Sequence, residues 1–204
     1  YGTRRRYLLG EGLDSVMNYP FRAAILAFLR GGDGRQMMDA ILAVVEHYPG
    51  PALHAAMNML STHDTPRILT ALLGEDPAGR GRAWQREQRL SPEAREEGIA
   101  RMRLGYALLF TLPGIPSVYY GDEIGMEGYT DPFNRGFYDW SSGEERLRGL
   151  ISQLSAVRRK ASAFAEGGFQ VEAAEEDFVA FTRTAEADSA LVLVNRGREA
   201  RELR

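Results

Sequence analysis

The stretch of sequence that decides the fold is Met57-Asn58-Met59-Leu60-Ser61-Thr62-His63-Asp64-Thr65-Pro66-Arg67. It begins with a short, mostly apolar run, and the residues from Ser61 onward are polar. An apolar run of this length is typical of a buried strand, and the polar residues then form a loop at its C-terminal end. Residues 57–67 therefore predict a strand that delivers His63 and Asp64 to the edge of a sheet.

A second stretch repeats the pattern. The run Pro116-Ser117-Val118-Tyr119-Tyr120 contains β-branched and aromatic residues, and Gly121-Asp122-Glu123 follows it. This order predicts a strand over residues 116–120 with a polar end.

Helices are predicted before and between these strands. Pro20 suits the first turn of a helix, and residues 37–45 have apolar side chains at helical spacing until Pro49-Gly50-Pro51 ends the pattern. Ser91-Pro92-Glu93 suits another helix start, with Ser as the cap, Pro at the first position and an acid in the first turn.

The rest of the chain changes character twice. Residues 74–90 have little periodicity and predict a long surface loop with a short helix around Trp84. A helix is predicted over roughly residues 144–159, with Leu147 and Val157 on its inward face. Short β-type runs then follow at 169–171, 178–183 and 191–195.

Strands that alternate with helices, each strand ending in a polar loop, fit part of a (β/α) barrel. The β-type runs after the last helix predict a small antiparallel unit. We therefore predict two domains, a partial barrel over residues 1–164 and the beginning of an all-β domain over residues 165–204.

Composition and charge argue against several classes of function. The 204 residues are 44% hydrophobic, enough to bury a core, and the formal net charge of -3 provides no basic field for nucleic acid or an acidic membrane. No apolar run of about eighteen residues predicts a membrane span. The absence of cysteine excludes disulfides and thiolate sites, and it leaves the compartment open.

Metal chemistry is not expected either. The three histidines have no paired ligand spacing, which argues against a transition-metal site. The cluster Glu172, Glu175, Glu176 and Asp177 is interpreted as a solvated turn.

Three segments of the chain resemble segments of the α-amylase family of glycoside hydrolases, and they occur in that family's order. They are Leu13-Asp14-Ser15-Val16-Met17-Asn18-Tyr19-Pro20-Phe21, residues 61–67 and Leu112-Pro113-Gly114-Ile115-Pro116-Ser117-Val118-Tyr119-Tyr120-Gly121-Asp122-Glu123-Ile124-Gly125-Met126. The likeness is greatest to neopullulanases, cyclomaltodextrinases and maltogenic amylases, and it includes Thr130-Asp131-Pro132-Phe133-Asn134-Arg135 and Trp140.

The resemblance implies an α/β fold: the C-terminal part of a (β/α)8 barrel, about strands six to eight with their helices, followed by the start of an antiparallel β-sandwich. The family's nucleophilic Asp and general-acid Glu lie upstream, on strands four and five. Neither motif occurs here, and Gly10-Glu11-Gly12 lies too close to the first matched segment to be the acid, so Glu11 is interpreted as a loop residue. We therefore expect an excised piece that is inactive as a separate chain.

The resemblance also assigns roles to four residues. Asp64 is the carboxylate that stabilises the transition state, and His63 is its substrate-binding companion. Asp131 and Arg135 match positions that bind sugar hydroxyls toward the non-reducing end. Taken alone, a His-Asp pair is more often a cap or loop pair and Asp-Pro-x-x-Arg is more often a turn.

Tyr19, Asp122 and Glu123 are weaker candidates. Tyr19 provides a ring that could stack on a sugar, but core packing is the preferred reading. Asp122 and Glu123 follow the second strand, where lining a cleft and fixing the loop remain alternatives.

The expected partner is an α-glucan oligosaccharide or polysaccharide, and glycosyl transfer requires no cofactor. Calcium stabilises some family members, but no residue here matches its ligands. The alternative function is a non-catalytic, α-amylase-like structural or carbohydrate-binding module. An incomplete barrel exposes sheet edges, so the separate chain is also expected to self-associate.

Overall fold

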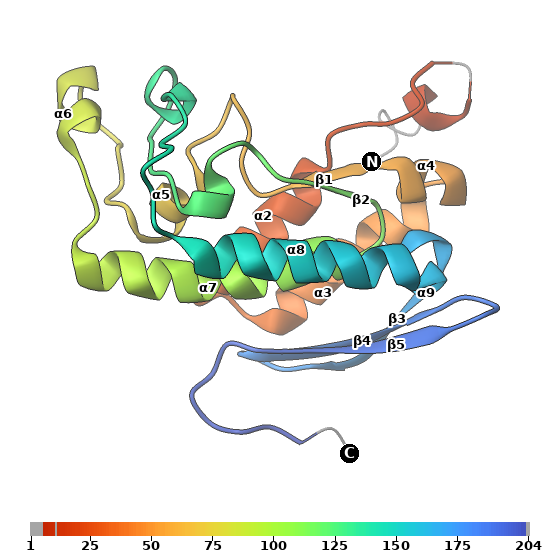
Figure 1. The fold of residues 1–204 in the computed structure, drawn as a ribbon. Coiled ribbons are helices and arrows are strands. Elements are labelled where there is room, and N and C mark those ends of the chain that lie inside the picture. Colours follow the sequence, from red (N-terminus) through yellow and green to blue (C-terminus); the bar gives the residue numbers. More distant parts are fainter. Residues whose placement is uncertain (1–5, 11, 203–204) are drawn as a thin grey trace.

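Two separate sheets organise the molecule, a short parallel pair beside the loops at the top of Figure 1 and a three-stranded antiparallel sheet at the bottom. The computed structural model describes residues 6–10 and 12–202, so Glu11 lies outside the described residues. The helices are η1 (Arg6–Leu8), α2 (Tyr19–Leu29), α3 (Gly34–His47), α4 (Gly50–Ala55), α5 (Ile68–Leu73), α6 (Arg82–Glu87), α7 (Pro92–Thr111), η2 (Asp122–Ile124), η3 (Phe133–Arg135), α8 (Glu145–Lys160) and α9 (Ser162–Glu166). The strands are β1 (Met57–Met59), β2 (Ile115–Ser117), β3 (Gly168–Ala174), β4 (Phe178–Thr184) and β5 (Ser189–Asn195).

The first sheet is parallel. β1 and β2 pair with Met57 opposite Ile115 and Met59 opposite Ser117, and Met17 forms a further parallel bridge to Met57. Helices α2 to α4 connect the Met17 segment to β1, and helices α5 to α7 connect β1 to β2. Because parallel segments end at the same edge of a sheet, the loops that follow them gather on one side.

Strand β2 is shorter than predicted. The prediction over residues 116–120 is wrong in its second half, because β2 ends at Ser117. Tyr119 and Tyr120 instead place their rings against the guanidinium of Arg67, with Cζ 4.8 Å from each ring centre. Gly121 then turns the chain with a φ of 86°, a conformation that favours glycine.

The predicted starts of α2 and α7 are confirmed by their caps. The side chain of Asn18 accepts a hydrogen bond from the backbone N–H of Phe21 (3.3 Å), and Ser91 Oγ accepts one from Ala94 (3.2 Å). The short helix predicted around Trp84 is α6. Helices α4 and α5 have no counterpart in the predicted pattern, because six residues are too few to establish a helical period.

Helix α8 has a different last turn from the predicted one. Leu147 is buried as expected, but Val157 is 52% exposed. Arg158 turns inward instead, and its guanidinium donates hydrogen bonds to the backbone oxygens of Phe110 (2.8 Å) and Gly114. Carbonyl groups around the end of α7 lack helical partners, so a guanidinium satisfies them where a valine would not.

The antiparallel sheet packs on the helices. β4 lies between β3 and β5, and residues 178–181 of this central strand are buried. Of these, Val179 and Phe181 belong to the core shared with α2, α3 and α7. The fully buried guanidinium of Arg183 donates to the backbone oxygens of Thr111 (2.7 Å) and Gly167 (2.9 Å). The sheet is therefore anchored to α7 and to the segment after α9, and the domain division between residues 164 and 165 stays a prediction.

Candidate functional site

The four residues expected to contact sugar lie in two loops on the same side of the molecule. His63 and Asp64 belong to the loop between β1 and α5, while Asp131 and Arg135 belong to the segment around η3. In Figure 1 these loops rise together at the upper left, beyond the ends of β1 and β2.

Arg135 joins the two loops. Its Nη2 atom lies 3.1 Å from Asp131 Oδ2 and 3.7 Å from Asp64 Oδ1, and His63 Nε2 lies 3.3 Å from Asp64 Oδ2. Both side chains of the His63–Asp64 pair are more than half exposed. We call His63, Asp64, Asp131 and Arg135 the rim. Its charged groups are thus in mutual contact and open to solvent.

Local hydrogen bonds shape the loop that carries Asp64. The backbone N–H of Thr62 donates to Thr65 Oγ1 (3.0 Å), and the backbone N–H of Asp64 donates to Thr62 Oγ1 (3.1 Å). Threonine hydroxyls commonly replace backbone acceptors in such turns. The turn leaves the Asp64 carboxylate free to face outward.

Asn134 connects the two loops beneath the rim, and its role is not evident from the sequence. Its side chain is fully buried, and Nδ2 donates to the backbone oxygens of His63 (2.8 Å) and Thr65 (2.9 Å). An asparagine in a loop is an ordinary turn residue, so only the tertiary contact reveals this function.

Arg67 forms a second connection under the loops. It is fully buried, and Nη1 donates to the backbone oxygen of Tyr120 (2.6 Å) and contacts Asp122 Oδ1 at 3.4 Å. Tyr120 in turn donates from its hydroxyl to the backbone oxygen of Gly136 (2.9 Å), next to Arg135. The loop after β1 is therefore tied to the segment that carries Arg135.

Asp122 lies below the rim. It is 1% exposed and is held by Arg67 and by the Tyr106 hydroxyl at 3.4 Å. Burial raises the pKa of the Asp122 carboxyl to about 7, although a hydrogen bond from Ser61 and the charge of Arg67 oppose the shift. The effect of burial on the pKa is the larger one, because the carboxyl is completely buried and its contact with Arg67 is long. This placement favours loop fixing over contact with a ligand.

The other two weak candidates lie apart from the rim contacts. Glu123 is half-buried in η2, and its Oε2 atom is buried without a hydrogen-bond partner. Tyr19 is the first residue of α2 and is half-buried. Within the described part of the chain, the ion pairs of the rim involve neither Tyr19 nor Glu123.

The described part of the chain comprises residues 6–10 and 12–202. These residues contain no group of three or more histidine, aspartate or glutamate side chains that could hold a metal ion. None of the helices described there is long and apolar enough to cross a membrane.

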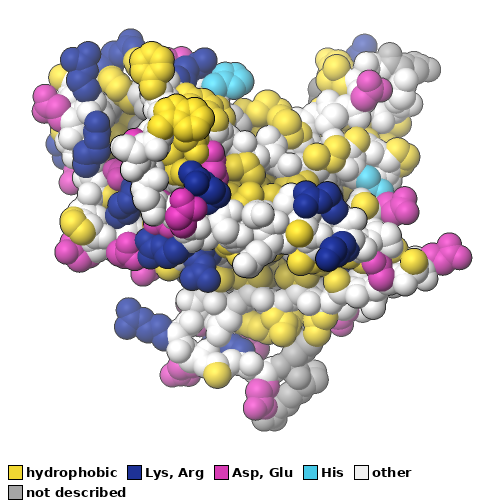
Figure 2. Space-filling model, viewed as in Figure 1, with side chains coloured by type: hydrophobic (Ala, Val, Ile, Leu, Met, Phe, Trp, Pro, Cys, Tyr) yellow, Lys and Arg dark blue, Asp and Glu magenta, His cyan; other side chains and the backbone are white. Residues whose placement is uncertain are grey.

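The rim has the chemistry of a receptor for neutral hydroxyl groups. Two carboxylates accept hydrogen bonds, a guanidinium donates them, and an imidazole can do either. Hydrogen bonds in which one partner is charged are stronger than neutral ones. Figure 2 shows hydrophobic surface close to basic and histidine side chains at the top of the molecule, a combination that suits the polar and apolar faces of a sugar.

Comparison with known protein families places this rim in context. The family described as the catalytic domain of α-amylase matches residues 2–176. The chain is 30% identical over 203 residues to the cyclomaltodextrinase of Geobacillus thermopakistaniensis, a match that covers 97% of the chain and 31% of that protein. It is 32% identical to neopullulanase 2 of Thermoactinomyces vulgaris, with 94% of the chain and 30% of the relative covered.

Solved structures agree with this relationship. The ligand-free cyclic α-maltosyl-(1→6)-maltose hydrolase of Arthrobacter globiformis superposes with a TM-score of 0.78 at 32% identity, covering 94% of this chain and 39% of that one. The debranching enzyme of Nostoc punctiforme, solved after soaking with acarbose, gives a TM-score of 0.77 at 26% identity and covers 95% of this chain and 39% of that one.

The chain spans about a third of the length of these relatives, and 12% of the amylopullulanase of Thermoanaerobacter thermohydrosulfuricus. The predicted fold class, the C-terminal part of a (β/α)8 barrel followed by an antiparallel sheet, is confirmed by these comparisons. The chain belongs to the α-amylase family of glycoside hydrolases, through its catalytic domain.

Proposed function

We propose that this chain is the sugar-binding, transition-state-stabilising part of a retaining α-glucan hydrolase or transglycosylase. The observation that carries the proposal is the contact of Arg135 with both Asp64 and Asp131 at one exposed rim. Residues 64 and 135 come from different loops, and a merely structural loop would not need to expose both carboxylates of this cluster.

Asp64 and His63 would act beside the bond that is cleaved. Retaining hydrolysis passes through an oxocarbenium-like transition state, and hydrogen bonds to the sugar hydroxyls strengthen as the ring flattens. Asp64 accepts such bonds, and His63, 3.3 Å away, orients the carboxylate and contacts a neighbouring hydroxyl. Interactions that strengthen in the transition state raise the rate of the chemical step.

Asp131 and Arg135 would hold the next sugar toward the non-reducing end. Their side chains form an ion pair at 3.1 Å, so the guanidinium is oriented before substrate arrives. A preoriented donor loses less conformational entropy on binding than a free arginine.

The chain taken by itself would be inactive. Retaining hydrolysis needs a nucleophilic carboxylate and an acid about 5 Å apart. The resemblance assigns neither role to a residue of this sequence. The cleaving pair would come from segments of the whole protein that precede this one.

The test is the activity of the whole protein with Asp64→Asn. We expect turnover of maltooligosaccharides to fall at least about a hundredfold, because hydrogen bonds of this kind supply several kcal/mol in the transition state and each tenfold corresponds to about 1.4 kcal/mol. Asp39→Asn, on the exposed face of α3, is the matched control. Unchanged turnover in the Asp64 variant, or a whole protein inert toward cyclodextrin, pullulan, starch and trehalose, would favour the non-catalytic module instead.

A further inference from the structure

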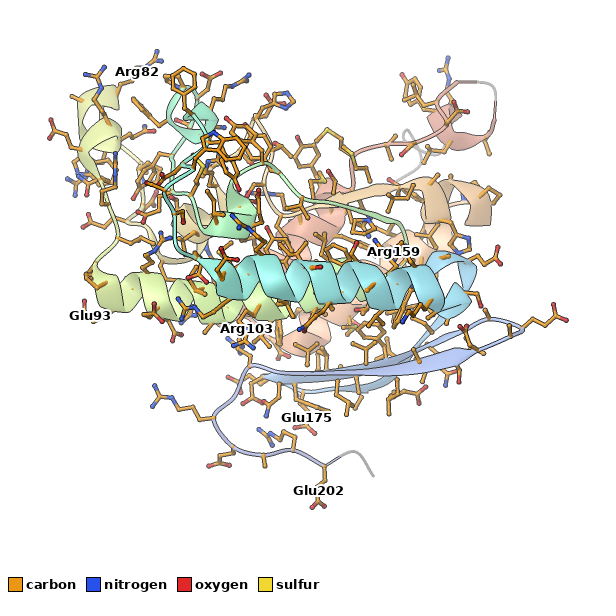
Figure 3. The ribbon with its side chains drawn as sticks, in the orientation of Figure 1. Arg82, Glu93, Arg103, Arg159, Glu175 and Glu202 are labelled. Atoms are coloured by element: carbon orange, nitrogen blue, oxygen red, sulfur yellow. The ribbon has the colours of Figure 1, made fainter. Side chains whose placement is uncertain are left out.

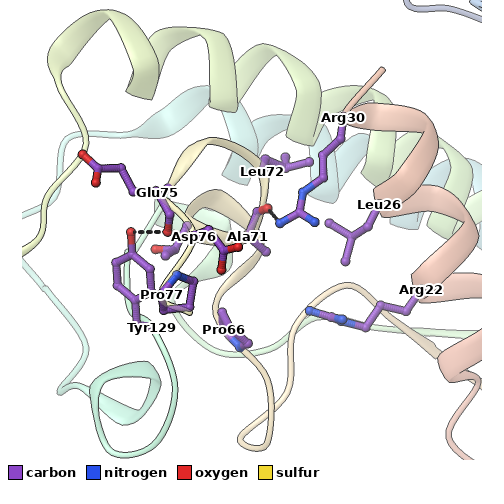
Figure 4. Close-up of a pocket in the computed structure, with 12 residues that line it drawn as sticks. Arg22, Leu26, Arg30, Pro66, Ala71, Leu72, Glu75, Asp76, Pro77 and Tyr129 are labelled. Carbon is purple, nitrogen blue, oxygen red and sulfur yellow. Dashed lines mark hydrogen bonds between the residues drawn. The ribbon is translucent and has the colours of Figure 1, made fainter. Parts of the chain in front are cut away.

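A cavity of about 480 Å³ lies between α2 and α5, behind the loop that carries Asp64. Figure 4 shows its walls: residues of α2 on one side, and Pro66, α5 and the segment 74–77 on the other. The volume falls within the range of small-molecule sites, about 300–1,000 Å³. We call it the α2–α5 pocket.

One wall of the pocket carries two arginines. Arg22 and Leu26 lie on one face of α2, and Arg30, the C-cap residue of this helix, follows Leu26 by four residues. Arg22 Nε donates to the backbone oxygen of Leu60 (2.8 Å), and Arg30 donates to that of Ala71. Burial lowers the pKa of Arg22, and the charge of Arg30 adds to the shift.

The opposite wall carries two acids. Glu75 and Asp76 belong to the segment after α5. Glu75 Oε2 lies 3.9 Å from Arg80 Nη2, outside the pocket lining, whereas no ion pair within 4.0 Å joins Asp76 to Arg22 or Arg30. Tyr129 stands beside them, held by a hydrogen bond from its hydroxyl to the backbone oxygen of Glu75 (3.1 Å). The pocket thus keeps the Asp76 carboxylate and the two guanidinium groups on facing walls, with no ion pair between them.

Apolar side chains complete the pocket. Leu26, Leu72, Pro66 and Pro77 line it between the charged groups, and the ring of Tyr129 lies at one end. A ligand with polar edges and apolar faces would contact both kinds of surface.

We propose that the α2–α5 pocket is a second binding site for a short α-glucan, separate from the rim. Each sugar hydroxyl both donates and accepts hydrogen bonds, so a glucan can satisfy the arginines and the acids together, whereas a simple anion satisfies one wall and is repelled by the other. The class of ligand rests on the proposed function. The location and the polarity of the pocket do not.

The experiment uses the whole protein with Asp64→Asn, in which turnover is expected to be slow, and measures maltotriose binding by equilibrium dialysis. Arg30→Met and Asp76→Leu are each expected to remove one binding site per molecule. Asp76→Asn keeps an oxygen that accepts hydrogen bonds and should weaken that site only about tenfold, as for a charged acceptor replaced by a neutral one. Arg103→Met, on the exposed surface of α7 (Figure 3), is the matched control and should retain every site.

The outcomes separate the two proposals. If Arg30→Met and Asp76→Leu bind as many maltotriose molecules as the Asp64→Asn protein and have its melting temperature, the pocket proposal is wrong. The proposal for the rim is not affected by that result. If glutamate displaces maltotriose, the pocket prefers a charged amino acid to a neutral sugar. That result overturns the proposed class of ligand but keeps the site. If the wild type neither hydrolyses nor binds any α-glucan, the proposed function itself fails.

Discussion

Single buried residues hold the exposed rim in place. Asn134 is fully buried, with Nδ2 directed at the backbone oxygens of His63 and Thr65, while its Oδ1 has no partner. Arg67 spans the gap to Tyr120 in the same way. The position of the Asp64 carboxylate therefore depends on donors that never contact a ligand.

Substitutions that remove the Nδ2 donor of Asn134 test whether this residue holds the loop that carries Asp64. Asn134→Ala leaves two backbone oxygens unpaired and should cost about 2 kcal/mol of unfolding free energy, since an unsatisfied buried group costs about 1–3 kcal/mol. Asn134→Asp has the same shape but presents an acceptor to the two carbonyl oxygens, so it should cost more than alanine. Urea unfolding of both variants measures this order. A stable aspartate variant would show that the donor is not needed.

The pKa of Asp122 predicts a pH dependence. The unfolded carboxyl titrates near 3.9 and the folded one at about 7, so the folded protein binds the extra proton between these values. The contribution of this group to the unfolding free energy is therefore fully present below about pH 4. It falls by up to about 4 kcal/mol as the pH rises to 7. The measurement is the difference in unfolding free energy between wild type and Asp122→Asn at pH 5 and pH 8. The wild type should lose stability relative to Asp122→Asn between pH 5 and pH 8.

At the scale of elements, close approach decides where the antiparallel sheet docks. Gly34, the first residue of α3, donates its N–H to the backbone oxygen of Glu176 (3.0 Å) in the turn between β3 and β4. A Cβ at this position would overlap the backbone oxygen of Glu175 and lie 2.8 Å from Val179 Cγ1. Only a glycine lets the turn contact the helix so closely.

Two glycine substitutions should therefore have opposite effects. Gly34→Ala should destabilise the protein by about 1–3 kcal/mol, the typical cost of overpacking. Gly149→Ala, on the exposed face of α8 with no atom within 4 Å of the added methyl, should stabilise it by up to about 1 kcal/mol through helix propensity. Thermal unfolding of the two variants provides the comparison. A gain from Gly34→Ala would mean that the sheet does not dock tightly on α3.

At the scale of the whole molecule, the parallel sheet has open edges. β2 pairs only with β1 among the described strands, and Ile115 at its start is 53% exposed. The outer face of β5 also exposes Leu191 and Leu193. Unpaired edges and apolar surface favour association with another chain.

We predict that the separate 204-residue chain self-associates at micromolar concentration. Ile115→Lys should reduce the association, because charged residues on edge strands oppose edge pairing. If Leu191→Lys reduces the association instead, the chains associate through the outer face of the antiparallel sheet and not through the edge of the parallel one. Light scattering after gel filtration gives the mass of each. A stable wild-type monomer would contradict the prediction.

The sequence by itself determined the local features: the helix starts at Asn18 and Ser91, the strand before His63, and the β-type runs at the end of the chain. Caps, turns and periodicity depend on neighbours within one or two turns, so they can be read from short stretches. Resemblance to a family added the grouping of Asp64 with Arg135.

Only the tertiary structure decided which side chains support the rim. Asn134 and Arg67 have no distinctive local pattern, and their partners His63 and Tyr120 lie 71 and 53 residues away in the chain. Parallel alignment of β1 with β2 ends both strands at one edge, while α2 contacts β1 and α7 contacts β2. Val157 was expected on the inward face of α8 but is exposed, and its neighbour Arg158 points inward and donates a hydrogen bond to a backbone oxygen at the end of α7. Contacts between distant segments depend on how all the elements pack together, and no local stretch of sequence contains that information.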